Sequence, residues 1–169
     1  EMGNQGKALE YFEQTLEIGK KVIGENHPDY ASILNNIGIV YKNLGDYDKA
    51  LRYHGQAVQI RKQVFGENHP NYVVSLNNIG LVYYNMGEYV KALEYYEQAL
   101  KIQKQMLGEK YLPYAGVLNN FGLVYESMGN YGEALKYFKQ ALKIKKQILG
   151  KKHLDYAISL SNVGNVYYD

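Results

Sequence analysis

Apolar and polar residues recur along this chain with the period of an α-helix. In one stretch the apolar and small residues stand at positions i, i+3, i+4 and i+7, on one helical face: Leu76, Ile79, Gly80 and Tyr83. The spacing predicts a helix over residues 70–86, ended by Gly87, because glycine is common just past a helix C-terminus. A second helix is predicted over residues 89–106, with Gly108 after it.

The same pattern returns every 42 residues. Four glycines mark this period: Gly24, Gly66, Gly108 and Gly150. Segment 24–65 matches segment 66–107 at 25 of 42 positions, and segment 108–149 follows the same pattern. Segment 1–23 matches the second half of a repeat, and segment 150–169 matches the first half. The whole chain, 1–169, is therefore predicted to be one array of three full repeats between two half-repeats.

Each repeat predicts a hairpin of two helices. Glycine recurs on the first helix, where a neighbouring helix must approach closely: Gly38, Gly80, Gly122 and Gly164. Pro28 and Pro70 suit the first turn of such a helix, with the preceding His or Asn as its cap. The half-repeats predict single helices over about 4–23 and 155–168. A hairpin cannot bury its apolar face alone, so the predicted fold is all-α, an α-solenoid of stacked hairpins.

Composition limits the class of protein and of site. The chain is 46% hydrophobic, carries a net charge of +2 and contains no cysteine, which excludes disulfides and thiolate chemistry. No apolar run is long enough to span a membrane, and the small net charge does not indicate nucleic-acid binding. We expect a cytoplasmic protein that binds neither membranes nor nucleic acid.

No residue pattern predicts catalysis. The chain lacks a P-loop, a nucleophile elbow and a His-Glu-x-x-His zinc motif. Histidines at equivalent repeat positions would lie too far apart for one metal ion, so a capping or linker role is expected for His27, His69 and His153. His54 is expected to be a partly buried packing residue. We therefore predict no enzyme, no metal site and no cofactor.

The repeat resembles the tetratricopeptide repeat. The resemblance rests on the segment 76–100, "LNNIGLVYYNMGEYVKALEYYEQAL", and covers the whole chain. The 42-residue period with a "GENHP" linker is similar to the repeats of kinesin light chains. This resemblance implies a right-handed superhelix of antiparallel helix hairpins, whose first helices line a concave groove. It indicates the scaffold strongly and the ligand weakly.

A stripe of polar and apolar residues follows each first helix beside its core face, and the resemblance turns this stripe toward the groove. Stacked repeats would then form a ladder of carboxamides: Asn36, Asn78, Asn120 and Asn162. Each carboxamide both donates and accepts hydrogen bonds, so it suits the backbone of an extended peptide. The other candidate groove residues are Ile39, Leu81, Leu123, Asn43, Asn85, Asn165, Lys42, Tyr84 and Glu126.

An alternative reading assigns one asparagine of each adjacent pair to packing. We favour this role for the first members, Asn35, Asn77 and Asn119, and a groove role for the second members. The candidate stripe is neutral, with only Lys42 nearby. Tyrosines that repeat at one phase, including Tyr41 and Tyr125, are expected to pack.

A basic cluster extends over residues 136–152, which contain seven lysines and no acid. A solvated helix face is the ordinary interpretation, and an acidic partner is the alternative. The leading functional hypothesis is a scaffold that binds a peptide segment of a partner protein in its groove. The second is a structural array element that associates head to tail through its terminal half-repeats.

Overall fold

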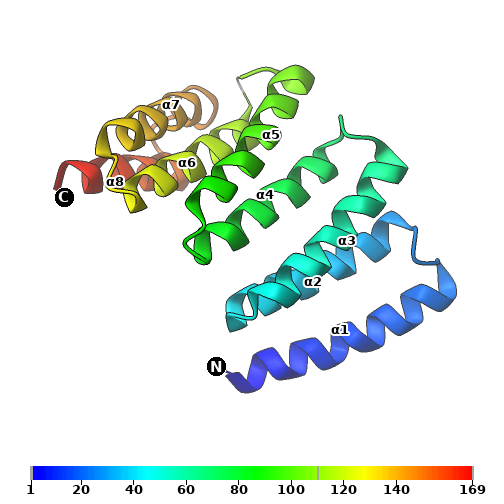
Figure 1. Cartoon of the computed structure of the whole chain (residues 1–169). Helices are drawn as coiled ribbons and strands as arrows, with labels where there is room; N and C mark the ends of the chain where they lie inside the picture. The colour runs from blue at the N-terminus through cyan, green and yellow to red at the C-terminus, as the bar shows by residue number, and fades with distance from the viewer. Residues whose placement is uncertain (1, 110, 169) are drawn as a thin grey trace. The chain divides into compact units, whose positions relative to one another are not determined.

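The computed structural model describes residues 2–109 and 111–168, without the side chains of residues 2–5. The described residues form α-helices joined by short loops (Figure 1), which confirms the predicted all-α class. The helices are α1 (Met2–Val22), α2 (Pro28–Leu44), α3 (Tyr47–Phe65), α4 (Pro70–Asn85), α5 (Tyr89–Leu107), α6 (Leu112–Ser127), α7 (Tyr131–Leu149) and α8 (Leu154–Tyr168). Every predicted helix boundary lies within two residues of the observed one.

The chain divides into two compact units. Unit 1, Glu1–Met86, contains α1 to α4, and unit 2, Gly87–Asp169, contains α5 to α8. Within each unit every helix packs on the next one along the chain, so the predicted architecture of sequential helix hairpins is confirmed. The division into full and half repeats remains a prediction.

Histidines cap the starts of helices, and glycines follow their ends, where the sequence predicts them. His27 Nδ1 accepts a hydrogen bond from the backbone N–H of Asp29 at 3.2 Å, at the start of α2. His69 and His153 accept the corresponding bonds at the start of α4 and α8. The predicted capping role of the three linker histidines is confirmed. At the end of α5, Gly108 adopts a φ of 76°, in the left-handed region that favours glycine.

Glycine lets the two helices of a hairpin approach closely. A Cβ atom added at Gly38 of α2 would lie 2.8 Å from atoms of the His54 ring on α3. The same addition at Gly122 of α6 would overlap the Phe138 ring on α7. At Gly164 of α8 an added Cβ would meet no described atom within 4 Å. The ring over Gly38 or Gly122 therefore requires glycine beneath it.

His54 is more deeply buried than the sequence predicts. Its side chain is 0% exposed, so the expectation of a partly buried residue is wrong. The cause is the absent side chain of Gly38, which leaves room for the imidazole between α2 and α3. His54 occupies the repeat position of Tyr96 and Phe138, which are also buried.

The cores of the two units use equivalent residues. In unit 1, Ala31 and Leu34 of α2 pack with Ala57 and Ile60 of α3. The matching cluster of unit 2 consists of Ala115, Leu118, Ala141 and Tyr114, with Ile144 beside it. The predicted packing is confirmed for Tyr41 and Tyr125, which stack on Tyr53 and Tyr137 with ring centroids 5.5 Å apart. It is wrong for two members of the repeated series in unit 2, because Tyr131 is 43% exposed and Tyr167 is 67% exposed.

Candidate functional site

An asparagine joins the hairpins within unit 1. Asn78 Nδ2 on α4 donates a hydrogen bond of 2.7 Å to Asn35 Oδ1 on α2. His54 Nδ1 on α3 lies 3.2 Å from the same oxygen and donates to it when Nδ1 carries the proton. The Asn35 side chain is 8% exposed, so this oxygen needs its partners. A single carboxamide oxygen thus links three helices.

Burial keeps this network neutral. Loss of solvation lowers the pKa of His54 to about 4, and the charges of Lys42 and Arg61 add to the decrease. At neutral pH the imidazole is therefore uncharged and presents one N–H donor. The network suits a fixed hydrogen bond, and not proton transfer at neutral pH.

The same bond recurs in unit 2. Asn162 Nδ2 on α8 donates to Asn119 Oδ1 on α6 at 2.6 Å. The packing role expected for Asn35 and Asn119 is therefore confirmed. Asn78 and Asn162, predicted for the groove, each contribute one N–H to the same contact. A carboxamide has two N–H donors and an acceptor oxygen, so this bond uses only part of its hydrogen-bonding capacity.

The predicted stripe of unit 1 is accessible along α2 and α4. Asn36 and Asn43 of α2 are exposed, as is Asn85 of α4. The remaining stripe residues of this unit are half-buried: Ile39, Lys42, Asn78, Leu81 and Tyr84. Apolar and amide side chains therefore share one helix face in unit 1.

The stripe of unit 2 has a similar mixture. Asn120, Leu123 and Glu126 of α6 are half-buried. On α8, Asn162 is half-buried and Asn165 is exposed. The structure brings Asn162 to Asn119, as Asn78 is brought to Asn35.

The sequence reading missed Arg61 beside this stripe. Arg61 of α3 is 6% exposed and donates to Ser75 Oγ of α4 at 2.6 Å. It also donates to Ser32 Oγ of α2, one helical turn before the stripe residue Asn36, at 3.3 Å. Burial lowers the pKa of this guanidinium. Lys42 is thus not the only basic residue near the stripe. The sequence feature that could have indicated Arg61 is the change of residue type at its repeat position, which is Gly19, Arg61, Gln103 and Lys145 in turn.

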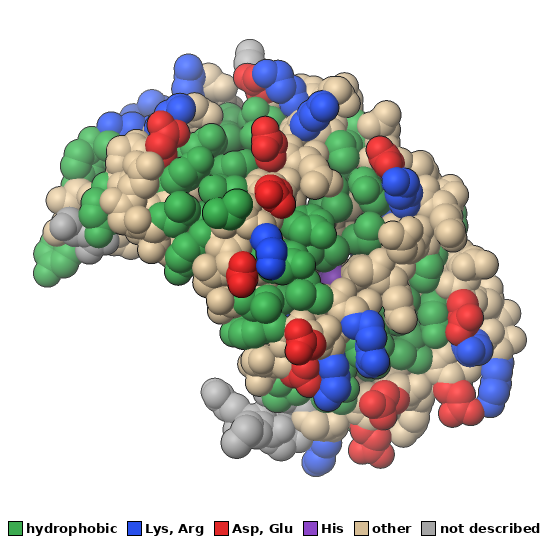
Figure 2. Space-filling view, in the orientation of Figure 1, with side chains coloured by type: hydrophobic (Ala, Val, Ile, Leu, Met, Phe, Trp, Pro, Cys, Tyr) green, Lys and Arg blue, Asp and Glu red, His purple; other side chains and the backbone are tan. Residues whose placement is uncertain are grey.

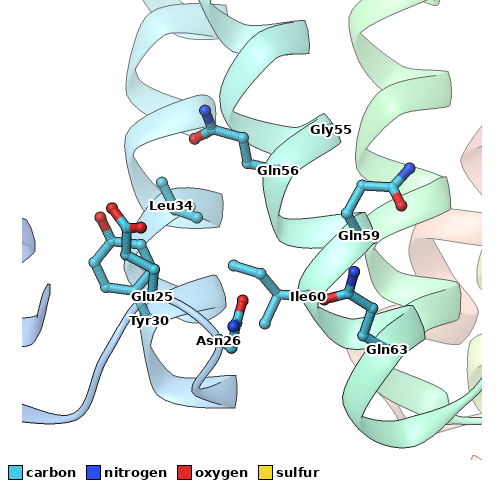
Figure 3. A pocket seen from close by; sticks show the side chains of 9 residues that line it. All are labelled: Glu25, Asn26, Tyr30, Leu34, Gly55, Gln56, Gln59, Ile60 and Gln63. Atoms are coloured by element: carbon cyan, nitrogen blue, oxygen red, sulfur yellow. The ribbon is translucent and has the colours of Figure 1, made fainter.

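A cleft of about 610 Å³ opens between α2 and α3 of unit 1. Figure 3 shows Tyr30 and Leu34 of α2 on one side and Ile60 of α3 on the other, with glutamines along α3. Burial raises the pKa of Tyr30, and the nearby Glu25 carboxylate adds to the rise. The cleft is lined by Glu25, Asn26, Tyr30, Leu34, Gly55, Gln56, Gln59, Ile60 and Gln63.

Unit 2 has an equivalent cleft of about 530 Å³, in which Gln140 and Gln147 of α7 take the places of Gln56 and Gln63. These outer clefts were not predicted. Their signal was the recurrence of glutamine every 42 residues on the second helix, at residues 56, 98 and 140.

Two classes of site have no counterpart in residues 2–109 and 111–168. No group of three His, Asp or Glu side chains there is placed to hold a metal ion. No helix among them is both long and apolar enough to cross a membrane.

Solved structures of similar fold span nearly the whole chain. BtubC (BKLC) from P. vanneervenii matches with a TM-score of 0.83 at 24% identity, over 99% of this chain and 66% of BtubC. A kinesin light chain-like protein of Podospora anserina with nearly identical TPR-like repeats matches with a TM-score of 0.78 at 22% identity, over 98% of this chain and 79% of that one. A Rap protein complexed with Competence and Sporulation Factor matches with a TM-score of 0.79 at 22% identity, over 98% of this chain and 44% of Rap.

Comparison of the sequence with family models agrees with these structures, whereas comparison with single curated sequences finds nothing. No curated protein sequence matches the chain significantly. The family model of the tetratricopeptide repeat matches residues 1–63, 29–105 and 114–169, which together cover most of the chain. The chain therefore belongs to the tetratricopeptide repeat family.

Proposed function

We propose that this chain is a non-enzymatic scaffold that binds a peptide segment of a partner protein along the stripe of its first helices. Tetratricopeptide repeat proteins mediate interactions between proteins. A structural neighbour, the Rap protein, was solved with Competence and Sporulation Factor bound. These comparisons support the class of function, and the residues of this chain suggest where the partner lies.

The observation that carries the proposal is the mixture of exposed amides and half-buried aliphatic side chains on α2 and α4. Asn36 and Asn43 offer hydrogen bonds to a peptide backbone, and Ile39 lies between them on α2. The bond to Asn35 holds the Asn78 side chain in one orientation before a ligand arrives. A pre-oriented donor or acceptor loses less entropy on binding than a mobile one.

Substitution of Asn36 tests this proposal better than substitution of Asn78. Asn36 is exposed, whereas Asn78 bonds Asn35 and its loss would also weaken the fold. Peptides selected from a random library would be measured by fluorescence anisotropy on the wild type and on Asn36→Ala. We expect roughly tenfold weaker binding, the loss of about one hydrogen bond to the peptide.

The matched control is Gln56→Ala, which removes an exposed amide from the outer cleft. Its affinity for the same peptides should equal that of the wild type. Unchanged binding by Asn36→Ala together with weak binding by Gln56→Ala would place the ligand in the outer cleft and contradict the proposal.

A second candidate function is head-to-tail association of copies, and the open space over Gly164 favours it. Gly164 of α8 lacks the ring that covers Gly122 in the preceding repeat. Phe12 of α1 occupies the repeat position of Phe138, the ring that covers Gly122. The α1 helix of a second copy would therefore bring an equivalent ring to Gly164.

Sedimentation velocity over about a hundredfold range of concentration tests this association, since assembly follows mass action. Gly164→Leu should fill the space that the Phe12 ring of a second copy would occupy, so this variant should stay a monomer at every concentration. A wild type that stays monomeric throughout would contradict head-to-tail association and leave peptide binding intact.

A further inference from the structure

An ion pair recurs where a second helix ends and the next linker begins. Lys20 Nζ lies 2.6 Å from Glu25 Oε1, in the linker after α1. The linkers after α3 and α5 hold the same pair: Lys62 with Glu67 at 2.5 Å, and Lys104 with Glu109 at 2.6 Å. These pairs are exposed, so each contributes little to stability, but their recurrence marks a position that the repeat fills with opposite charges.

The fourth such junction, between α7 and the linker to α8, has a lysine where the other three have the glutamate. Lys146 of α7 stands at the position of Lys104, but Lys151 stands where Glu109 would be. Lys152 follows, and Lys143 lies one helical turn before Lys146. Lys143, Lys146, Lys151 and Lys152 are exposed, and we name these four lysines the basic junction. Figure 2 shows blue side chains gathered over α7.

No carboxylate of the described residues forms an ion pair with the basic junction. Glu133, the preceding acid in the sequence, pairs with Lys136 at the opposite end of α7, at 2.9 Å. Asp155, the following acid, lies 3.9 Å from His153 Nδ1. Glu109 lines the same cleft as Lys143 but is held by Lys104. The four cations thus repel one another, and none of the ion pairs among the described residues offsets that repulsion.

Aliphatic side chains accompany these lysines. Leu154, at the start of α8, is 72% exposed, and Ile148 in the last turn of α7 is 43% exposed. A surface that combines unpaired lysines with exposed aliphatic residues matches an acidic protein segment that carries apolar side chains.

Two other anionic partners fit less well. Residues 143–154 contain no arginine, and their one aromatic ring is that of His153, which caps α8. Single-stranded nucleic acids are bound through several such rings on which successive bases stack. A helix that lies in a membrane surface needs a free apolar face, and the apolar face of α7 is buried at Ala134, Phe138 and Ala141.

We propose that the basic junction binds an acidic segment of a partner protein, a run of Asp and Glu with an aliphatic residue. This site consists of residues at the end of α7 and in the linker to α8, none of which belongs to the stripe. The two sites differ in chemistry, since the stripe offers mainly amides and the junction offers charge. Binding at the junction is therefore sensitive to salt.

Lys151→Glu is the variant that tests this proposal. It restores the Lys–Glu pair of the other three junctions, so it should fold as well as the wild type. The probe is a fluorescein-labelled peptide of ten glutamates and one central leucine, titrated and followed by anisotropy. We expect the wild type to bind, with affinity falling about tenfold in Lys151→Glu and falling again when salt is raised.

Lys151→Arg is the matched control, because it keeps the charge and should keep the affinity. Equal affinity of the wild type and Lys151→Glu would overturn the proposal, as would no binding by the wild type at low salt. Vesicles of anionic lipid and duplex DNA serve as competing probes. Tighter binding of either, lost in Lys151→Glu, would reassign the junction and also overturn it.

Discussion

Some buried side chains of this protein differ in chemical type between equivalent positions of the repeats, and His54 is the main example. His54 takes the place of Tyr96 and Phe138 at a fully buried site, and its Nδ1 lies 3.2 Å from Asn35 Oδ1 on the neighbouring helix. The cost is a titratable group in an apolar site, because protonation there would bury a charge without a carboxylate partner among the described residues.

Acid should therefore destabilise unit 1 through His54. Its pKa is about 4 in the folded chain and 6.5 when unfolded, so the unfolded state binds the proton first. The contribution of neutral His54 is complete above pH 6.5 and is lost as pH falls toward 4. The free energy of unfolding should decrease by up to about 3 kcal/mol over this interval. Urea denaturation of the wild type and of His54→Phe at several pH values measures the difference.

His54→Phe removes the titrating group and copies the ring of Phe138 over Gly122. Its unfolding free energy should lose the part of the pH dependence between pH 6.5 and 4. An identical pH profile in both proteins would show that His54 is already protonated, or solvated, in the folded state.

The glycines beneath the rings of His54 and Phe138 are required because a side chain there would overlap the ring. Gly38→Ala would bring a methyl group within 3 Å of the His54 ring, which is held between two helices. We expect a loss of roughly 1–2 kcal/mol in unfolding free energy, since overpacking exceeds the gain in helix propensity. Gly164→Ala is the control, with open space around it. Thermal denaturation that ranks Gly164→Ala below Gly38→Ala in stability would be inconsistent with this packing.

At the scale of the elements, hydrophobic period and glycine spacing were sufficient to predict each helix within two residues. The pairing of elements was only partly predictable. Periodicity places Asn35 and Asn78 on their own helices, but their hydrogen bond depends on the offset between neighbouring hairpins. A single sequence does not contain that offset. For the same reason the contact of Arg61 with both Ser32 and Ser75 was not foreseen.

The bond between hairpins gives a test of this packing. Asn78→Asp replaces the Nδ2 donor by a second oxygen facing Asn35 Oδ1. We expect the unfolding free energy to fall by about 1–2 kcal/mol, because a hydrogen bond becomes a repulsion. Asn36→Asp makes the same chemical change at the equivalent, exposed position of the preceding repeat.

Asn36→Asp should leave stability within about 0.5 kcal/mol of the wild type, as surface substitutions usually do. Chemical denaturation compares the two variants directly. Equal stabilities for the two would mean that the bond between Asn78 and Asn35 contributes nothing to the folded state.

At the scale of the whole molecule, repetition separates what the fold requires from what the ligand requires. Features present in every full repeat, such as the buried alanines at positions 57, 99 and 141, follow from stacking. Features that change from repeat to repeat, such as Lys151 in place of glutamate, are available for recognition. The family and fold were recognisable from the 42-residue period, whereas the outer clefts required coordinates because they form between segments of different helices.

The central claim is that a partner's peptide lies on the stripe of the first helices. Photo-crosslinking tests it most directly, with a benzoylphenylalanine placed either at Asn43 on the stripe or at Gln56 in the outer cleft, both exposed positions of unit 1. A peptide selected for binding should crosslink to the probe at position 43 and not to the probe at position 56. Crosslinking at position 56 alone would contradict the account.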